Sequence, residues 1–356
     1  MQELEIEYDG FNLYNAGSGY SQNFSRDSIL SAILAEDSDM LRNQLSFCAV
    51  KQGLDKNPYS GEEPGKIFHE FPEVNINGLS TGFAACDTTA LYLIGHEVYQ
   101  KSEGDKSLAE EHKESIERAV GYIISHLDNN LFTESPEFCG AGKFALKVTY
   151  WKDSGILDRE NEEPMYPIVY TLAHVQNMCG LRCAARILGS GSLKKTAAKM
   201  SKALQKLYDK ESELFYIAID KQGPVRGINS DFLNALFYLE PGDLPEEQLE
   251  GIVKSSAVLE TSIGYRTLDS ALSSLVVDEY HGSKTVWPVE QAIIYSAARR
   301  FGLDHVQEVT SRIVPLLDTD PEFFVLEGDG ITKGGCDPQL WTWAARNTLQ
   351  QMSDVK

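Results

Sequence analysis

The chain has 356 residues, of which 42% are hydrophobic and 24% charged, a composition typical of a globular protein. Its 53 acidic and 32 basic residues give a net charge of −21, which disfavours nucleic acid, anionic membranes and polyanionic substrates as partners. No run of about eighteen apolar residues occurs, the first residues are acidic, and the six cysteines form no CxxC pair. We therefore expect a cytoplasmic protein with free thiols, no membrane span and no secretory signal.

Apolar residues recur at intervals of three and four along most of the chain, which predicts helices. Within residues 193–207, for example, Leu193, Ala197 and Leu204 fall on one stripe. Strand signals are few and short, such as residues 214–219. In chain order the pattern predicts about a dozen helices, at residues 28–36, 37–52, 86–103, 108–127, 167–189, 193–210, 230–239, 245–257, 268–276, 288–302, 303–317 and 338–353.

The predicted helices occur in pairs, with short turns within a pair and longer loops between pairs, and no repeat of fixed period is visible. This pattern predicts an all-α fold in a single domain that spans residues 1–356. A barrel of six helical hairpins, the (α/α)6 toroid, would hold such a set and gather its long loops at one end. Those loops contain most of the unusual residues and lie at 10–27, 55–85, 128–166, 258–287 and 318–337.

Residues 150–154 read Tyr-Trp-Lys-Asp-Ser and contain the first candidate for a catalytic residue, Asp153. Glycoside hydrolysis needs a carboxylic acid that protonates the leaving oxygen, and apolar neighbours raise the pKa of such an acid by desolvating its charged form. Tyr150 and Trp151 would supply that environment, and they would also offer a face for a sugar ring. The alternative is that Asp153 caps a turn ahead of Gly155, and this segment alone does not decide.

Arg26 and Asp27 form a charged pair between an aromatic loop and an apolar helix. Such a pair can hold two adjacent sugar hydroxyls, because the guanidinium donates hydrogen bonds and the carboxylate accepts them. A local ion pair at a helix start would explain the same residues. Asp87, in the segment Cys-Asp-Thr-Thr, is open to two similar interpretations, a sugar ligand or an N-cap.

Two later regions carry further candidates. Tyr280, His281 and Trp287 stand directly before an apolar helix, which indicates a binding edge, although Trp287 could equally anchor the core. Near the C-terminus Glu322 lies next to two phenylalanines and Glu327 precedes a glycine turn. Either glutamate could be a catalytic base or a solvated surface residue, and the residues themselves leave the choice open.

The sequence offers little support for a metal site, a serine nucleophile or a phosphate-binding loop. The histidines show no HExxH or similar ligand spacing, so we expect no metal site. Cys179 and Cys183 share a helix face without a second ligand pair and are interpreted as core residues. No GxSxG or GxxxxGK[ST] segment occurs, and no organic cofactor is expected.

Five short segments, taken in order, resemble the catalytic domain of amylo-alpha-1,6-glucosidases, the glucosidase half of glycogen-debranching enzymes. Glucoamylases, trehalases and glucosylglycerate hydrolases are more distant resemblances. Residues 25–28 resemble the family's Arg-Asp-Ser/Thr segment, residues 86–91 its Asp-Ala-Thr-Pro-Leu segment, and residues 151–154 its Trp-Lys-Asp-Ser segment. Residues 280–288 resemble Tyr-His-Asn-Gly-Ser-Val-Trp-Pro, and residues 336–341 resemble Cys-Ser-Pro-Gln-Ala-Trp.

The resemblance implies an (α/α)6 barrel that hydrolyses with inversion, with Asp153 as the acid and a late glutamate as the base. Residues 321–324 resemble the family's Pro-Glu-Leu-Phe, which favours Glu322 and keeps Glu327 as the second candidate. The chain has no room for the transferase or β-rich domain of full debranching enzymes, and its loop from Glu322 to Cys336 is shorter. By this resemblance the residues that contact the sugar are Arg26, Asp27, Asp87, Trp151, Lys152, Gln176, Tyr280, His281 and Trp287.

The expected function is therefore that of an inverting exo-glycoside hydrolase, an α-glucosidase-like enzyme that releases a terminal α-linked glucose from a small or oligomeric glucoside. Inversion requires the two carboxyl groups to lie about 6.5–9.5 Å apart. One alternative is a sugar epimerase or lyase on the same barrel, with His281 or His174 as its base. Another is an inactive carbohydrate-binding protein. The sugar, linkage, aglycone and oligomeric state stay open.

Overall fold

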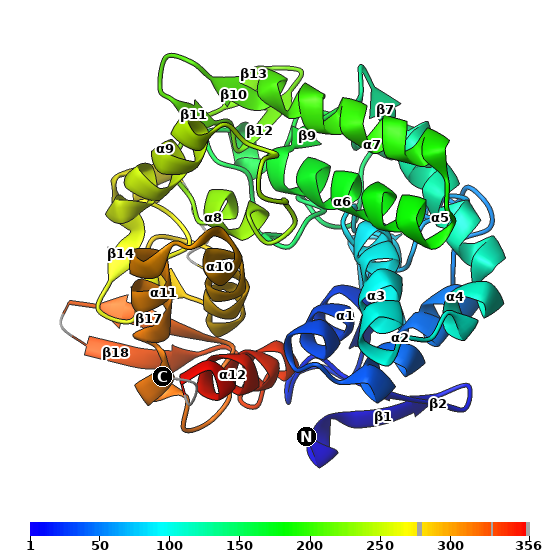
Figure 1. Ribbon diagram of the computed structural model, residues 1–356, viewed down its shortest axis with the longest axis horizontal. Coiled ribbons are helices and arrows are strands. Elements are labelled where there is room, and N and C mark those ends of the chain that lie inside the picture. The colour runs from blue at the N-terminus through cyan, green and yellow to red at the C-terminus, as the bar shows by residue number, and fades with distance from the viewer. Residues whose placement is uncertain (276–279, 329, 354–356) are drawn as a thin grey trace.

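The computed structural model describes residues 1–275, 280–328 and 330–353 of the chain. Its helices lie in an inner and an outer layer around a common centre (Figure 1). Each inner helix packs against the next one in the chain, and the last packs against the first. In order these are α1 (Ser25–Leu34), α3 (Thr88–Glu103), α6 (Thr171–Ile187), α8 (Asp231–Ala235), α10 (Pro288–Phe301) and α12 (Leu340–Ser353).

The outer helices cover the inner ones and show one apolar face each. In α7 the buried residues are Leu193, Ala197, Met200 and Ala203, which are spaced as the sequence pattern predicts. By contrast, nine of the ten residues of α1 are buried, as expected for an inner helix. The outer layer consists of α2 (Ser38–Val50), α4 (Ser107–Glu111), α5 (Lys113–Ser125), α7 (Gly191–Ala203), α9 (Glu246–Ser256) and α11 (Asp304–Ser311).

The loops between helices contain short antiparallel strands, of which the sequence indicated only a few. Their pairs are β1–β2 (Glu5–Tyr8, Phe11–Tyr14), β3–β4 (Asn23–Phe24, Glu70–Phe71), β5–β6 (Asn75–Ile76, Leu79–Ser80), β7–β8 (Leu127–Asp128, Leu131–Phe132), β10–β11 (Tyr208–Asp209, Leu214–Phe215) and β14–β15 (Glu260–Thr261, Gly264–Tyr265). Two sheets have three strands, β13–β12–β9 (Gly223–Val225, Ala218–Asp220, Val169–Tyr170) and β16–β17–β18 (Thr285–Val286, Phe323–Glu327, Gly330–Gly334).

Most predicted helices are present with shifted ends. The segment 108–127 divides into α4 and α5, and the segment 268–276 contains a 3-10 helix, Ser270–Leu275, with Val276 outside the described residues. Further 3-10 helices lie at Gln2–Leu4, Pro136–Cys139, Glu160–Glu162, Leu204–Leu207, Ala257–Leu259 and Val314–Leu316. Within the described part of the chain, no helix has the length and apolar character needed to cross a bilayer.

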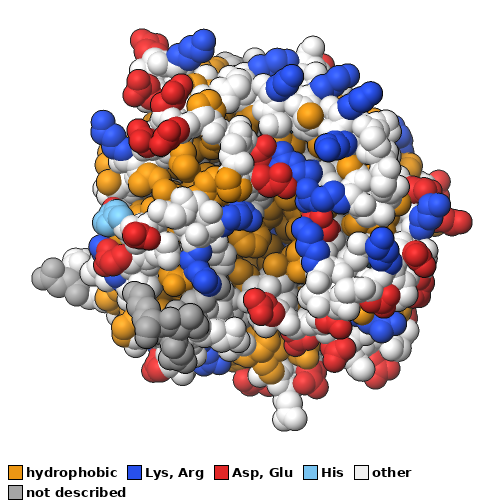
Figure 2. Space-filling model, viewed as in Figure 1, with side chains coloured by type: hydrophobic (Ala, Val, Ile, Leu, Met, Phe, Trp, Pro, Cys, Tyr) orange, Lys and Arg blue, Asp and Glu red, His pale blue; other side chains and the backbone are white. Residues whose placement is uncertain are grey.

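One face of the molecule is hollowed at the centre of the ring. Hydrophobic side chains line this hollow, and charged side chains surround it (Figure 2). The inner helices all begin at one end of the ring, because the outer helices return the chain to that end. Candidate site residues lie at these starts: Arg26 and Asp27 in the first turn of α1, Asp87 before α3 and Trp287 before α10.

Candidate active site

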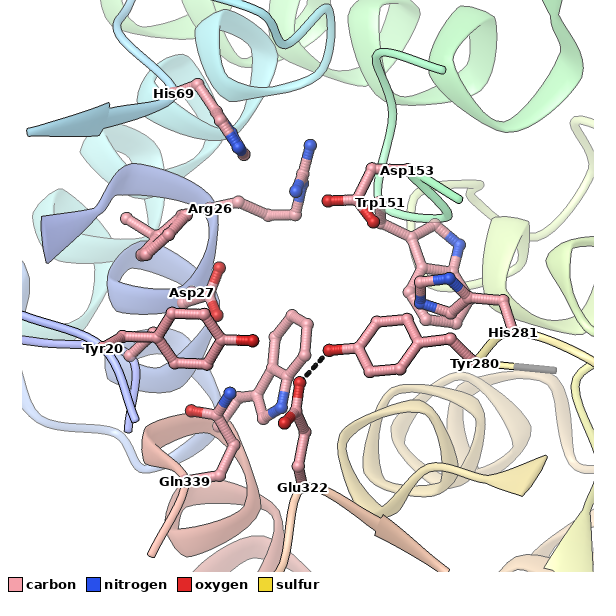
Figure 3. A pocket seen from close by; sticks show the side chains of 13 residues that line it. Tyr20, Arg26, Asp27, His69, Trp151, Asp153, Tyr280, His281, Glu322 and Gln339 are labelled. Atoms are coloured by element: carbon pink, nitrogen blue, oxygen red, sulfur yellow. Dashed lines mark hydrogen bonds between the residues drawn. The ribbon is translucent and has the colours of Figure 1, made fainter. Parts of the chain in front are cut away.

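A cavity of about 170 Å³ lies where the inner helices begin. Figure 3 shows side chains from well-separated parts of the chain converging on it. Seven of the residues predicted from the sequence line this cavity: Arg26, Asp27, Trp151, Asp153, Tyr280, His281 and Glu322. The remaining lining residues are Ala16, Tyr20, Phe24, His69, Gln339 and Trp341.

Asp153 points its carboxyl group into the cavity beside the Arg26 guanidinium (Figure 3). Burial raises the pKa of Asp153 to about 6, and the nearby charge of Arg26 opposes this rise. A carboxyl group with such a pKa holds a proton in a useful fraction of molecules near neutral pH, as a general acid must.

The segment that carries Asp153 is held from behind by Asp231, the first residue of α8. The Asp231 carboxylate accepts hydrogen bonds from the Tyr150 hydroxyl and the Trp151 indole N–H, both at 2.9 Å. Its Oδ1 also lies 3.1 Å from the Lys152 ammonium. All four side chains are buried, so this cluster fixes the segment through hydrogen bonds that water cannot replace. The residues themselves offered no sign of this role for Asp231.

Replacing Asp231 with asparagine should destabilise the fold by about 3 kcal/mol, because it leaves the buried Lys152 without its nearest counter-charge. Urea unfolding followed by circular dichroism measures this change. The control is Glu117→Gln, which removes an exposed ion pair with Lys113 and should leave the unfolding free energy nearly unchanged. Equal stability of Asp231→Asn and the wild type would contradict the assigned role.

Two residues predicted to contact a sugar point elsewhere, because they bind other buried groups. Lys152 donates to Ser230 Oγ at 3.0 Å and is absent from the cavity wall. Asp87 neither lines the cavity nor caps α3 with its side chain. Its carboxylate accepts two hydrogen bonds from Arg26, at 2.8 and 3.0 Å. This bidentate pair sets the orientation of the guanidinium.

Glu322 lies across the cavity from Asp153 (Figure 3). Its side chain is 2% exposed. Oε1 accepts a hydrogen bond from the Tyr280 hydroxyl, and Oε2 accepts one from the Cys336 backbone N–H at 3.0 Å. A side chain at Gly335 would collide with the Glu322 carboxylate, so glycine is required at this position. Together these contacts hold the carboxylate in one orientation.

Glu327, the second candidate for the base, does not belong to the cavity. It is the last residue of β17, is exposed, and pairs with Gly330 across the β17–β18 hairpin. The cavity wall as described does not include it. Glu327 lies five positions after Glu322 along an extended segment. Glu322 therefore lies in the cavity wall, whereas Glu327 lies in solvent.

Asp27 adds a third carboxyl group to the cavity. Burial raises the pKa of Asp27 to about 7, and Arg26 opposes that rise. Glu322 and Asp153 raise it further, because like charges disfavour ionisation. The cavity is therefore rich in acidic groups.

Trp287 and Gln176 lie behind the cavity wall. Trp287 is fully buried, and its ring stacks on His281 at 4.8 Å, so it supports the wall instead of facing a ligand. Gln176 is absent from the cavity wall and lines a small adjoining pocket with Glu290 and Asn234. Burial raises the pKa of Glu290 to about 7.

Five of the polar or aromatic residues in the cavity wall, among them Phe24, were not predicted as site residues. Gln339 and Trp341 belong to the segment 336–341, whose family resemblance could have identified them. Tyr20 lies in the aromatic loop before Arg26. His69 had no sequence signal; burial holds the pKa of its ring well below the usual value, so the ring is neutral.

No protein-family model and no curated protein sequence matches the chain. Solved structures do match it. The GH63 mannosylglycerate hydrolase from Thermus thermophilus in complex with glucose aligns with a TM-score of 0.70 and 10% identity, over 95% of this chain and 95% of that chain. Its complex with Tris and D-glycerate aligns with a TM-score of 0.66 and 11% identity, over 96% of each chain. The GH78 family rhamnosidase of Bacillus sp. GL1 gives 0.61 and 14%, over 93% of this chain and 31% of that chain.

These similarities establish a shared fold. Both proteins are described as glycoside hydrolases, and the shared fold confirms the predicted helical class for this chain. At such low identities a similar fold does not by itself carry a reaction to this chain. The chemistry of this chain depends on its own cavity residues.

Proposed function

We propose that the protein is an inverting exo-glycoside hydrolase that removes a terminal α-linked glucose from a small or oligomeric glucoside. The observation that carries this proposal is the pair of carboxyl groups, Asp153 and Glu322, on opposite sides of one cavity (Figure 3). Inverting enzymes need this arrangement, because the acid and the base act on opposite faces of the sugar ring. The debranching-type segments quoted above support glucose as the sugar.

We also propose that the fold is the (α/α)6 toroid of six-hairpin glycosidases. The inner helices contact one another in chain order and the last returns to the first, which supports this assignment. The six free cysteines support the cytoplasm as the location, since thiols persist in a reducing compartment.

In the proposed reaction Asp153 donates its proton to the glycosidic oxygen as the bond from that oxygen to the anomeric carbon breaks. Glu322 accepts a proton from a water molecule, whose oxygen forms the new bond to the anomeric carbon. The aglycone leaves as an alcohol, and the sugar leaves with the opposite anomeric configuration. Tyr280 orients the Glu322 carboxylate through its hydrogen bond.

The terminal ring would be held by charged and aromatic groups of the same cavity. Arg26 uses two of its N–H donors on Asp87, and its guanidinium has five in all, so it retains donors for sugar hydroxyls. Asp27 can accept from a hydroxyl group. Trp151, whose indole N–H is bound to Asp231, presents a rigid ring for stacking.

The charges of the cavity favour an uncharged aglycone. Among the described lining residues, the single cationic side chain is Arg26, and its charge is paired with Asp87. Burial lowers the pKa of the two lining histidines, His69 and His281, well below the usual value, so they are neutral. Three carboxyl groups face this space. A carboxylate on the aglycone would meet repulsion without a compensating cation.

The test is a screen of α-glucosides with NMR detection of the first anomer released. We expect hydrolysis with initial release of β-glucose. Two members of the screen form a matched pair, α-glucosylglycerol and α-glucosylglycerate, which differ by one carboxylate. The uncharged member should have the larger kcat/KM, by about tenfold or more. Initial release of α-glucose would overturn inversion, and preference for the glycerate would overturn the charge argument.

The same screen separates the alternatives. Glucose that raises the Tm without any hydrolysis would indicate a binding protein. An epimerase or lyase that uses His174 is not favoured, because His174 is absent from the described cavity wall and backbone groups engage both of its ring nitrogens. Nδ1 accepts from the Phe132 N–H at 3.1 Å, and Nε2 lies 3.1 Å from the Met200 carbonyl oxygen. His281 stays in the cavity wall, with Nδ1 2.9 Å from Ser154 Oγ.

A further inference from the structure

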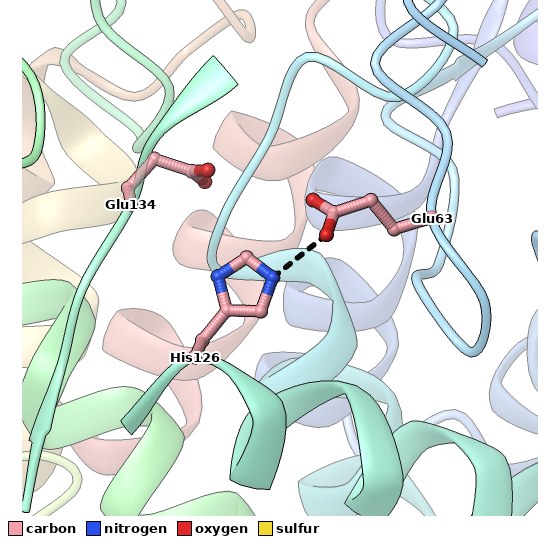
Figure 4. Close-up of side chains that lie close together, drawn as sticks. All are labelled: Glu63, His126 and Glu134. Atoms are coloured by element: carbon pink, nitrogen blue, oxygen red, sulfur yellow. Dashed lines mark hydrogen bonds and ion pairs between the residues drawn. The ribbon is translucent and has the colours of Figure 1, made fainter. Parts of the chain in front are cut away.

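A second cluster of ionisable side chains lies outside the cavity wall. It consists of Glu63, His126 and Glu134, whose candidate ligand atoms all lie within 4.8 Å of one another. Figure 4 shows the three side chains directed toward one another from three segments. Glu63 belongs to the loop before β4, His126 follows α5, and Glu134 follows β8. All three are at least nine-tenths buried.

The His126 ring is oriented with one nitrogen toward the backbone and the other toward the carboxylates. Nδ1 lies 3.0 Å from the Thr133 carbonyl oxygen, which can only accept, so Nδ1 carries a hydrogen. In the neutral ring Nε2 is then an acceptor. Metal-bound histidines typically show this pattern, with the second nitrogen donating to a carbonyl group.

The carboxylates supply oxygen atoms that need a partner. Nε2 of His126 lies 3.0 Å from Glu63 Oε2, so two acceptors face each other unless a proton or a cation lies between them. Glu134 Oε2 is buried and has no hydrogen-bond partner among the described residues. Its other oxygen accepts from the Ser135 N–H at 3.1 Å. A proton on His126 would satisfy Glu63 but would leave Glu134 Oε2 without a partner.

The nearby charges leave room for an added cation. Lys66 is fully buried, and its ammonium lies 3.8 Å from Glu63 Oε1. It is therefore the counter-charge of one carboxylate. With a neutral His126, the two carboxylates and this one lysine sum to one negative charge. A buried uncompensated negative charge is costly, and a divalent ion bound between the ligand atoms would offset it, changing the sum from one negative to one positive charge.

We propose that Glu63, His126 and Glu134 bind one divalent metal ion of the first transition row, such as Zn²⁺ or Mn²⁺. One imidazole and two carboxylates form a donor set that suits these ions. Metal–ligand bonds of about 2.1 Å in a tetrahedral site place ligand atoms about 3.4 Å apart. His126 Nε2 and Glu63 Oε2 already lie 3.0 Å apart, and ligand atoms separated by as much as 4.8 Å would move closer on binding. Sequence spacing predicted no metal site, because the three ligands come from separate segments.

Such a metal would fasten two loops that lead into the cavity. Glu63 lies six residues before His69, and Glu134 lies nineteen residues before Asp153. His69 and Asp153 both line the cavity. The metal ion itself is outside that lining, so its role is structural, and its binding does not depend on the proposed hydrolysis.

The test uses the full chain after dialysis against a chelator, with ZnCl₂ and MnCl₂ as separate probes. Isothermal titration should show one ion bound per chain, and Tm should rise with the concentration of the ion that binds. Glu134→Gln keeps the acceptor for Ser135 but removes the charge, and it should weaken metal affinity by about tenfold or more. Glu137→Gln changes an exposed residue three positions away and should bind as the wild type does.

Three results would overturn the proposal. The first is the absence of stoichiometric binding of either ion to the wild type. The second is equal metal affinity in Glu134→Gln and the wild type, which would place the bound ion elsewhere. The third is a His126 ring that NMR shows to be protonated on both nitrogens in the presence of saturating metal. None of these results depends on catalytic activity.

Discussion

Replacing Asp153 with asparagine should lower kcat/KM for an alkyl α-glucoside by about 10²–10⁴-fold, because asparagine cannot donate a proton to the leaving oxygen. The side chain keeps its size, and Asp231 still holds the segment through Tyr150, Trp151 and Lys152. We therefore expect sugar binding to persist, which a Tm shift with glucose measures.

Two controls separate loss of the acid from damage to the fold. A substrate with a good leaving group, such as α-glucosyl fluoride, needs no protonation and should be affected much less by Asp153→Asn. Asp158→Asn changes an exposed carboxylate of the same loop and should leave kcat/KM unchanged. Equal losses on both types of substrate would contradict the assignment of Asp153 as the acid.

The pH profile gives an independent measure of the same group. Burial raises the pKa of Asp153 to about 6, so the protonated, competent form prevails below that pH and is lost as the pH rises through it. The wild type should therefore show a falling basic limb. Asp27 titrates in the same range, with a pKa of about 7, so the variant is needed to assign the limb. The residual activity of Asp153→Asn should not show the fall near pH 6 that the titration of Asp153 causes in the wild type.

Replacing Glu322 with glutamine should lower kcat/KM by about 10²–10⁴-fold on all α-glucosides, including the fluoride. Water activation is required whatever the leaving group is, and a neutral amide cannot accept the proton. This independence of the leaving group distinguishes the base from the acid. The glutamine is nearly isosteric and can still accept from the Tyr280 hydroxyl, so the loop should keep its conformation.

Glu327→Gln is the matched control, since Glu322 directly precedes β17 and Glu327 is the last residue of that strand. Glu327 is exposed and stands outside the described cavity wall, so its replacement should leave kcat/KM close to that of the wild type. Loss of activity in Glu327→Gln, together with an active Glu322→Gln, would assign the base to Glu327. Circular dichroism of both variants checks that the fold is intact.

The helices were predictable because most of them bury one face and expose the other. In α7 the apolar residues recur at helical spacing, and the predicted and observed stripes agree. The ends of a helix were predicted less well where all of its faces are buried. The start of α1 was placed three residues late, because its first turn holds Ser25, Arg26 and Asp27, polar residues that are nevertheless buried. Periodicity carries no signal for a helix buried on all sides.

Several of the residues that line the cavity were predictable from the sequence, but the directions of the predicted side chains were less so. Short motifs identified Asp153, Glu322 and Arg26, which do line the cavity. They did not show that Lys152 and Asp87 turn away from it. Each has a buried partner distant in the chain, Asp231 for Lys152 and Arg26 for Asp87. Such partners cannot be identified before the tertiary structure places the distant segments next to one another.

The sequence by itself determined the helical class and the residue types available for sugar chemistry, because periodicity and short motifs are local properties. Only the tertiary structure decided between Glu322 and Glu327 as cavity residues, because a five-residue separation along β17 places one carboxylate inside and the other in solvent. It also brought Glu63, His126 and Glu134 together. Contacts between distant segments depend on how the helices pack, and no local pattern records that packing.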